Sequence, residues 1–134
     1  MYESFSYQAG KGLKTNLTIE EITQSLQDEQ SLLWIDLSDI DDSDVDLLTT
    51  TFNLHPLTIE DFILPNARPK IENFNDYLYL IMFSLEAPSH NQGKLKAHEL
   101  DCCLGRNFLI TYHNSSVGPL TACKEKVKKQ SPII

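Results

Sequence analysis

The order of apolar and polar residues along this chain predicts strands at five places. YESFSYQ alternates aromatic with polar residues, as a strand does. LLWIDL and DYLYLIMFSL are apolar almost throughout, which is typical of strands that are buried on both faces, and we expect the second to be central in its sheet. Two further strands, LKAHELDCCLG and NFLITYH, are predicted around a turn at Gly105 and Arg106.

Helix start and stop signals predict three helices. Thr18 and Glu21 form a capping-box pattern ahead of a helix over about residues 19–27. Pro56 suits the first position of a second helix, in HPLTIEDFILP, which Pro65 ends. SSVGPLTACKEKVKKQ predicts a last helix with its lysines on one side. The apolar faces of the first and last helices would consist of Ile19, Ile22 and Leu26, and of Leu120, Cys123 and Val127.

Two segments are expected to connect these elements. AGKGLKT lacks the upstream glycine of a phosphate-binding loop, so it predicts only a turn. Pro69 disfavours helix at Arg68, so NARPKIEN predicts an extended connection. Within it, we expect Arg68 and Lys70 to pair with nearby acids rather than to take part in metal binding.

The segment DLSDIDDSDVD, residues 36–46, is rich enough in aspartate to suggest a cation site. An EF-hand loop would need glycine at its sixth position and glutamate at its twelfth, and registers starting at Asp39 or Asp42 supply neither. A helix that begins near Asp42 explains the run better, because carboxylates in a first turn cap free amides and meet the positive end of the helix dipole. Val45, Leu48 and Phe52 would then form its buried stripe.

Composition places the chain among ordinary globular domains. Its 134 residues, 41% of them apolar, suffice for a single domain over residues 1–134 with a core of its own. The pattern of elements predicts an α/β (α+β) fold, in which helices flank both faces of a mixed sheet. The net charge of -8 argues against nucleic acid as a partner, and three cysteines, two of them adjacent, do not make a disulfide framework.

Several short motifs, in this order and spacing, resemble the CorA family of magnesium-transporting membrane proteins. The resemblance covers the middle and most of the C-terminal part of the chain and continues in CLGRNFLITYH. The motifs are Trp34-Ile35-Asp36, His55-Pro56-Leu57, Ile59-Glu60-Asp61, Arg68-Pro69-Lys70-Ile71-Glu72 and the tyrosine-rich segment that follows.

The resemblance implies an α/β/α sandwich that serves as the N-terminal cytoplasmic domain of a longer protein. Members of this family are homopentamers of the cell inner membrane, with a stalk helix and two membrane helices per subunit, and we expect this chain to end before the stalk. In the family, divalent ions between neighbouring cytoplasmic domains hold the channel shut. The resemblance assigns Asp61, with Glu60 beside it, as candidate regulatory Mg²⁺ ligands, for which Co²⁺ or Ca²⁺ could substitute.

Other interpretations remain open at the level of sequence. Glu60 and Asp61 lie in the middle of a helix, where most acids are simply solvated. His55, at a helix start, is expected to be a cap or a packing residue rather than a metal ligand. The cytoplasmic domain of a related zinc transporter is an alternative, although the histidines, at positions 55, 90, 98 and 113, make no obvious zinc site. A stand-alone α/β small-molecule-binding domain or enzyme is the least favoured, because we find no nucleophile beside a base and no glycine-rich phosphate loop.

Overall fold

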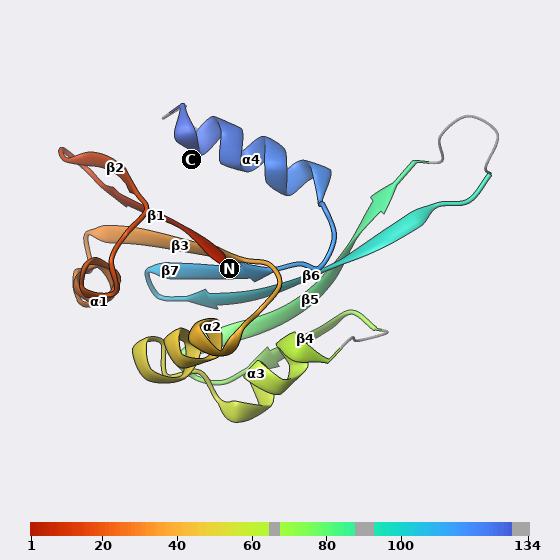
Figure 1. The fold of residues 1–134 in the computed structure, drawn as a ribbon, viewed down its shortest axis with the longest axis horizontal. Coiled ribbons are helices and arrows are strands. Elements are labelled where there is room, and N and C mark those ends of the chain that lie inside the picture. Colours follow the sequence, from red (N-terminus) through yellow and green to blue (C-terminus); the bar gives the residue numbers. More distant parts are fainter. Residues whose placement is uncertain (65–67, 88–92, 130–134) are drawn as a thin grey trace.

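The computed structural model describes residues 1–64, 68–87 and 93–129, in which seven strands form one mixed sheet (Figure 1). The strand order is β2-β1-β3-β7-β6-β5-β4; β3 and β7 are parallel, and the other neighbours are antiparallel. The strands are β1 Tyr2–Gln8, β2 Gly12–Thr15, β3 Ser31–Leu37, β4 Lys70–Asn73, β5 Tyr77–Glu86, β6 Lys96–Gly105 and β7 Phe108–Tyr112. The helices are α1 Ile19–Gln27, α2 Asp42–Asp46, α3 Pro56–Ile63 and α4 Gly118–Lys128, and a π-helical turn, η1, spans Leu47–Thr51.

Helices lie on both faces of the sheet. Figure 1 shows α1, α2 and α3 on one side and α4 on the other. The predicted fold class, a mixed sheet flanked by helices on both faces, is therefore confirmed.

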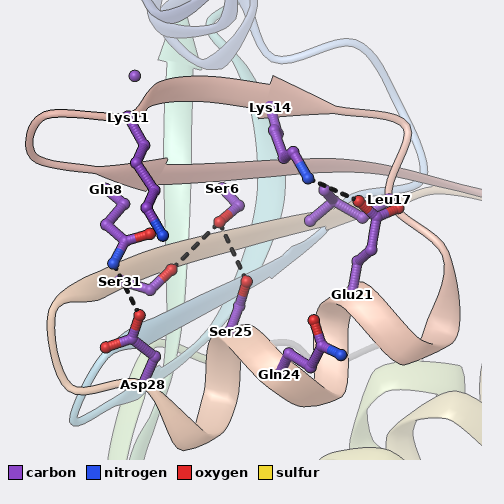
Figure 2. Close-up of a pocket in the computed structure, with 11 residues that line it drawn as sticks. Ser6, Gln8, Lys11, Lys14, Leu17, Glu21, Gln24, Ser25, Asp28 and Ser31 are labelled. Atoms are coloured by element: carbon purple, nitrogen blue, oxygen red, sulfur yellow. Dashed lines mark hydrogen bonds and ion pairs between the residues drawn. The ribbon is translucent and has the colours of Figure 1, made fainter.

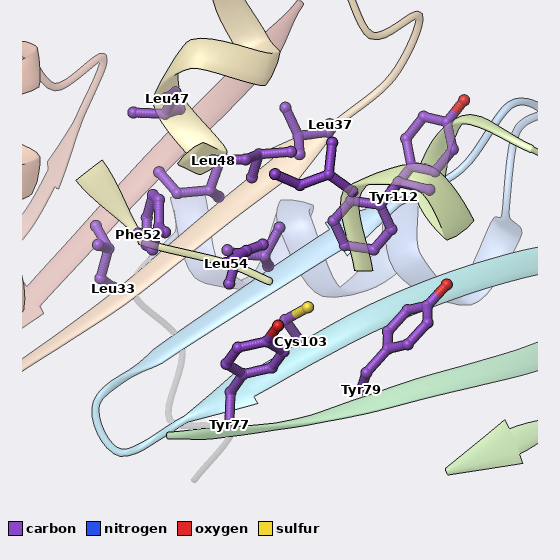
Figure 3. Close-up of a cluster of buried hydrophobic side chains, with 14 of the residues drawn as sticks. Leu33, Leu37, Leu47, Leu48, Phe52, Leu54, Tyr77, Tyr79, Cys103 and Tyr112 are labelled. Atoms are coloured by element: carbon purple, nitrogen blue, oxygen red, sulfur yellow. The ribbon is translucent and has the colours of Figure 1, made fainter. Parts of the chain in front are cut away.

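The hydrophobic core fills the space between the sheet and the layer of α1, η1 and α3 (Figure 3). Ile22 of α1, Leu48 of η1 and Phe62 of α3 pack there against Ile35 and Ile110 of the central strands, and all five are 0–1% exposed. Full burial of one such side chain contributes about 1.5–3 kcal/mol to stability. This core fixes α3, which carries the candidate metal ligands, against the sheet.

Two helices begin with capping boxes, and one of them explains the aspartate run. In α1, the Thr18 hydroxyl accepts from the Glu21 amide at 3.1 Å, as predicted. In α2, the Asp41 carboxylate accepts from the Asp44 amide at 2.9 Å, and Asp44 accepts from the Asp41 amide at 3.1 Å. The N-terminal ammonium of Met1 also pairs with Asp44, which is 1% exposed. The run is therefore a helix start, and the prediction of a helix near Asp42 is confirmed.

Several side chains that we expected on buried helix faces are more exposed than predicted. Ile19 is 49% exposed, because α1 turns only Ile22 fully toward the sheet. Val45 is half-buried and packs at the margin of the core. On α4 no described side chain is fully buried, and Cys123 is exposed. The lysines of α4 do not all face away from the sheet either: Lys124 contacts Asp36 of β3 and Glu3 of β1.

The ends of the sheet also differ from the sequence prediction. The segments expected to be a turn and an extended connection contain the short edge strands β2 and β4. Strand β5 is not central, because its outer neighbour is β4, which has only four residues. The predicted helix stop at Pro65 lies outside the described residues, although α3 ends just before it, at Ile63.

In the described part of the chain, much of one face of β4, β5 and the adjoining edge of β6 is open to solvent. Alternation along β5 turns Tyr77, Tyr79 and Ile81 toward the core and Leu78, Leu80 and Met82 toward the opposite face. By register, Ile71 of β4 and Leu104 of β6 share that opposite face. Four of these side chains are 38–70% exposed, namely Ile71, Leu78, Met82 and Leu104. We call this surface the open apolar face. It contradicts the expectation that β5 is buried on both sides.

Candidate functional site

Helix α3 positions the two candidate metal ligands. His55 precedes it as the N-cap residue, and its Nδ1 accepts from the Leu57 amide at 3.0 Å, so the capping role predicted for His55 is confirmed. Pro56 occupies the first turn, where its missing N–H costs nothing. The buried face of α3 comprises Thr58, Ile59 and Phe62. Glu60 is consequently exposed, and the side chain of Asp61 is 28% exposed at the edge of the core.

Asp61 is not a merely solvated acid, because Lys70 of β4 holds it. Lys70 Nζ donates to Asp61 Oδ2 at 2.8 Å and lies 2.7 Å from Glu72 Oε1. The ammonium also lies 5.6 Å from the centre of the Tyr79 ring, within cation–π range. Hydrogen bonds to Asp61 first, and then to Glu72, raise the pKa of Lys70. The pairing predicted for Lys70 is confirmed, and any ion that binds Asp61 competes with this ammonium.

A second acid, Asp101, is buried on the core side of the sheet. Asp101 of β6 is 0% exposed, and its Oδ2 accepts from the Tyr79 hydroxyl at 2.6 Å. No described donor reaches its Oδ1. Burial first, and then the neighbouring Glu99 carboxyl group, raises the pKa of Asp101 to about 8. Both influences favour the protonated form of Asp101.

A second charged cluster ties α4 to the other face of the sheet. Asp36 is 3% exposed and accepts from Thr111 at 2.5 Å and from His113 at 3.0 Å, and it also pairs with Lys124. Lys124 in turn lies 2.9 Å from Glu3. These hydrogen bonds hold the pKa of Asp36 below its ordinary value even though burial, the largest single influence, raises it. No local sequence pattern joins residues that lie so far apart in the chain.

Asp101 could have been noticed in the sequence. Glu99, Asp101 and Cys103 are each two residues apart in a predicted strand, so their side chains share one face. This spacing places an acid on the same face as a core cysteine. The aspartate-rich segment drew attention instead, although its acids serve as helix caps.

The described residues hold no complete metal site of their own. No three histidine, cysteine, aspartate or glutamate side chains among them are grouped so that they could ligate one ion. His98 lies 2.9 Å from Glu86, and His113 pairs with Asp36 at another place in the sheet; His90 lies outside the described residues. Burial raises the pKa of the Cys102 thiol to about 12 and that of Cys103 also, so neither is a thiolate at neutral pH. What α3 offers is one exposed and one partly exposed carboxylate.

Comparison with known proteins assigns the family. The sequence model described as CorA-like Mg2+ transporter protein matches residues 29–133. The chain belongs to the CorA family. The match includes α3 with Glu60 and Asp61, and also Lys70.

Curated proteins related to this CorA-family chain are described as metal ion transporters. The putative metal ion transporter YfjQ of Bacillus subtilis is 26% identical over 122 residues, which cover 91% of this chain and 36% of that protein. The cobalt/magnesium transport protein CorA of Thermotoga maritima is 24% identical over 98% of this chain and 37% of its own length. The chain thus spans little more than a third of these relatives.

Solved structures share the fold. The soluble domain of CorA from Methanocaldococcus jannaschii superposes with a TM-score of 0.67 at 14% identity, over 98% of this chain and 48% of that one. The ZntB cytoplasmic domain from Vibrio parahaemolyticus gives a TM-score of 0.68 at 10% identity, over 95% of this chain and 49% of that one. Within the described part of this chain, no helix is long and apolar enough to cross a bilayer.

Proposed function

We propose that this CorA-family chain is the cytoplasmic regulatory domain of a divalent-cation transporter that carries Mg²⁺ and also Co²⁺. It senses intracellular Mg²⁺ through carboxylates at the contacts between identical subunits, with Asp61 and Glu60 as its ligands. The longer protein is a homopentamer in the cell inner membrane, with this domain on the cytoplasmic side. The observation that carries the proposal is the family match over residues 29–133, which includes both acids.

The surface of α3 fits a shared magnesium site rather than a self-contained one. Mg²⁺ keeps several of its waters and is bound through one or two carboxylates, so one chain can supply part of a site. Lys70 already neutralises Asp61, so an arriving ion must displace or share an ammonium. That competition weakens binding, as a sensor of an abundant ion requires. Other divalent ions that accept oxygen ligands, Ca²⁺ and Co²⁺, can substitute.

Net charge supplies the coupling between ion binding and assembly. Each copy carries a charge of -8, so neighbouring copies repel one another. A cation bound between them relieves the repulsion and favours the closely packed arrangement. A ligand shifts such an equilibrium only by the difference in its affinity for the two states, and a site divided between subunits provides that difference. Loss of the ion then favours a splayed, conducting arrangement.

A zinc transporter is the second candidate, supported by the similarity to the ZntB cytoplasmic domain. It is less favoured, because the described histidines are each engaged separately, in a helix cap or beside an acid. Comparing Mg²⁺ and Zn²⁺ as protecting ions in the experiment below distinguishes the two.

Proteolysis of a membrane-embedded protein that carries this domain tests the proposal. We expect Mg²⁺ to protect the wild-type protein and Asp61→Ala to shift the half-protecting concentration upward roughly tenfold, because a charged ligand is lost. Asp46→Ala is the matched control, because Asp46 is an exposed acid on α2 and its replacement removes the same charge. Protection curves that coincide for Asp61→Ala and wild type would remove Asp61 from the site.

A further inference from the structure

The polar pocket between α1 and the hairpin of β1 and β2, about 270 Å³ in volume, is balanced in charge (Figure 2). It is lined by two lysines, Lys11 and Lys14, and by two carboxylates, those of Glu21 and Asp28. Lys14 pairs with Glu21 at 3.1 Å. The charges of the lining residues therefore indicate no particular ligand.

His113, on the side of the sheet that α4 covers, differs because both of its ring nitrogens face acceptors. Its Nε2 lies 3.0 Å from Oδ2 of Asp36, and its Nδ1 lies 3.0 Å from the main-chain oxygen of Ser115. Burial, the largest influence, raises the pKa of Asp36, but hydrogen bonds from His113, Lys124 and Thr111 outweigh it and hold that pKa below its ordinary value. Asp36 is thus a carboxylate at neutral pH. A carboxylate and a carbonyl oxygen only accept, and a histidine donates from both nitrogens only when it is protonated.

Charged groups from β3, α4 and β1 surround this ring. The hydrogen bond with Asp36 is the main influence that raises the pKa of His113 above its ordinary value. Burial and the Lys124 ammonium act in the opposite direction. Glu3 offsets that ammonium in part, because it lies 2.9 Å from Lys124 and 3.6 Å from Lys128. The balance favours the charged ring, in agreement with the hydrogen-bond geometry.

His98, which also contacts Ser115, is not constrained in this way. Its Nε2 lies 2.9 Å from Glu86, and its Nδ1 lies 2.8 Å from the Ser115 hydroxyl. A hydroxyl can donate or accept, so this contact persists whether or not Nδ1 carries a hydrogen. Of these two histidines, only His113 must lose a hydrogen bond when its ring becomes neutral.

We propose that protonation of His113 controls how the segment leading into α4 is attached to the sheet. The charged ring joins Asp36 of β3 to the main chain at Ser115, just before α4 begins at Gly118. A neutral ring keeps one hydrogen, which is directed at the carboxylate because that is the stronger acceptor. Ser115 then loses its donor and the start of α4 loosens, while Lys124 still pairs with Asp36. This control is independent of magnesium sensing, because α3 lies on the opposite face of the sheet (Figure 1).

The direction of the pH dependence follows from the raised pKa of His113. The ring adds stability that is fully present below the ordinary histidine pKa, and this contribution is lost as the pH rises through the folded-state pKa. The segment is therefore attached on the acidic side of this range and released on the alkaline side.

NMR of the ¹⁵N-labelled chain across neutral pH, without Mg²⁺, tests this inference. We expect the His113 ring to titrate with a pKa above the ordinary histidine value. The amide of Thr121, which donates to the Val117 carbonyl at 3.0 Å, reports on the start of α4. Its protection from hydrogen exchange, corrected for the intrinsic effect of pH, should fall roughly tenfold as His113 loses its proton, because one hydrogen bond is lost.

His113→Gln should abolish this change in protection, because its amide does not titrate. His98→Gln is the matched control, since it removes a histidine beside the same serine, and it should retain the change. The inference is overturned if His113 titrates at or below the ordinary histidine value, or if Thr121 keeps its protection throughout that titration. Loss of the pH dependence in His98→Gln, or its persistence in His113→Gln, would also overturn it.

Discussion

At the scale of single residues, the acids of this chain differ in role because their surroundings differ. Asp41 and Asp44 cap a helix, Asp61 pairs with a lysine, and Asp101 is buried beside Glu99, where its pKa is raised. Sequence spacing predicted the capping role, because caps depend on neighbours within one helical turn. It could not predict the raised pKa of Asp101, which depends first on burial in the folded core and then on Glu99.

The raised pKa of Asp101 predicts a dependence of stability on pH. The folded chain retains a proton that the unfolded chain releases near pH 4, so this residue lowers stability as the pH rises from about 4 toward 8. Asp101→Asn mimics the neutral acid and removes the effect. We expect its free energy of unfolding, relative to wild type, to rise across that window by up to about 1.4 kcal/mol per pH unit.

Urea denaturation at several pH values measures this difference, and Asp46→Asn, at an exposed position, should show no such trend. A difference between Asp101→Asn and wild type that stays constant with pH would mean that Asp101 is ionised in the folded chain.

At the scale of elements, periodicity predicted most helices and strands but not their neighbours. The bounds of α1 and the first strand agree with the sequence, since capping and alternation are local properties. The short strands β2 and β4 were missed because their pairing partners, and not their own patterns, define them. The position of Lys124 was also mispredicted, because the buried acid that attracts it is on β3, far away in the chain.

The attachment of α4 to the sheet is expected to depend on Lys124. Without its ammonium, the buried Asp36 keeps only Thr111 and His113 as partners. Breaking a buried ion pair costs about 3–5 kcal/mol, and because the two remaining partners compensate in part, we expect Lys124→Met to lower the free energy of unfolding by about 1–3 kcal/mol.

Hydrogen exchange should accelerate at the amides of α4 in Lys124→Met and remain unchanged in the core strands. Lys126→Met on the same helix should alter stability by less than about 0.5 kcal/mol. If the two substitutions have the same effect, the ion pair does not hold the helix.

At the scale of the whole molecule, the fold class and the family were predictable from the sequence, whereas the acid with which Lys70 pairs was not. The motif around Asp61 indicates a family, but only the structure shows that Lys70 forms an ion pair with this carboxylate. The structure also shows no group of three possible metal ligands among the described residues. A site shared between copies leaves no pattern in one copy's sequence beyond its own ligands.

Calorimetric titration of the 134-residue chain with Mg²⁺ tests whether its site is shared. We expect weak binding without defined stoichiometry, because one chain supplies only part of the ligand set and Lys70 competes for it. Ca²⁺ and Co²⁺ should behave similarly. A micromolar affinity with one ion per chain would show that the site is self-contained and would refute the division between subunits.

The open apolar face has a consequence for the chain in a test tube. Ile71, Leu78, Met82 and Leu104 share one face across three strands, and each is 38–70% exposed in the described part of the chain. Monomeric soluble proteins rarely expose a large contiguous patch of apolar side chains. The purified protein is therefore expected to bind phenyl resins and to increase the fluorescence of hydrophobic dyes without unfolding. Its solubility should fall as the salt concentration rises, because salt screens the repulsion between molecules that each carry a charge of -8.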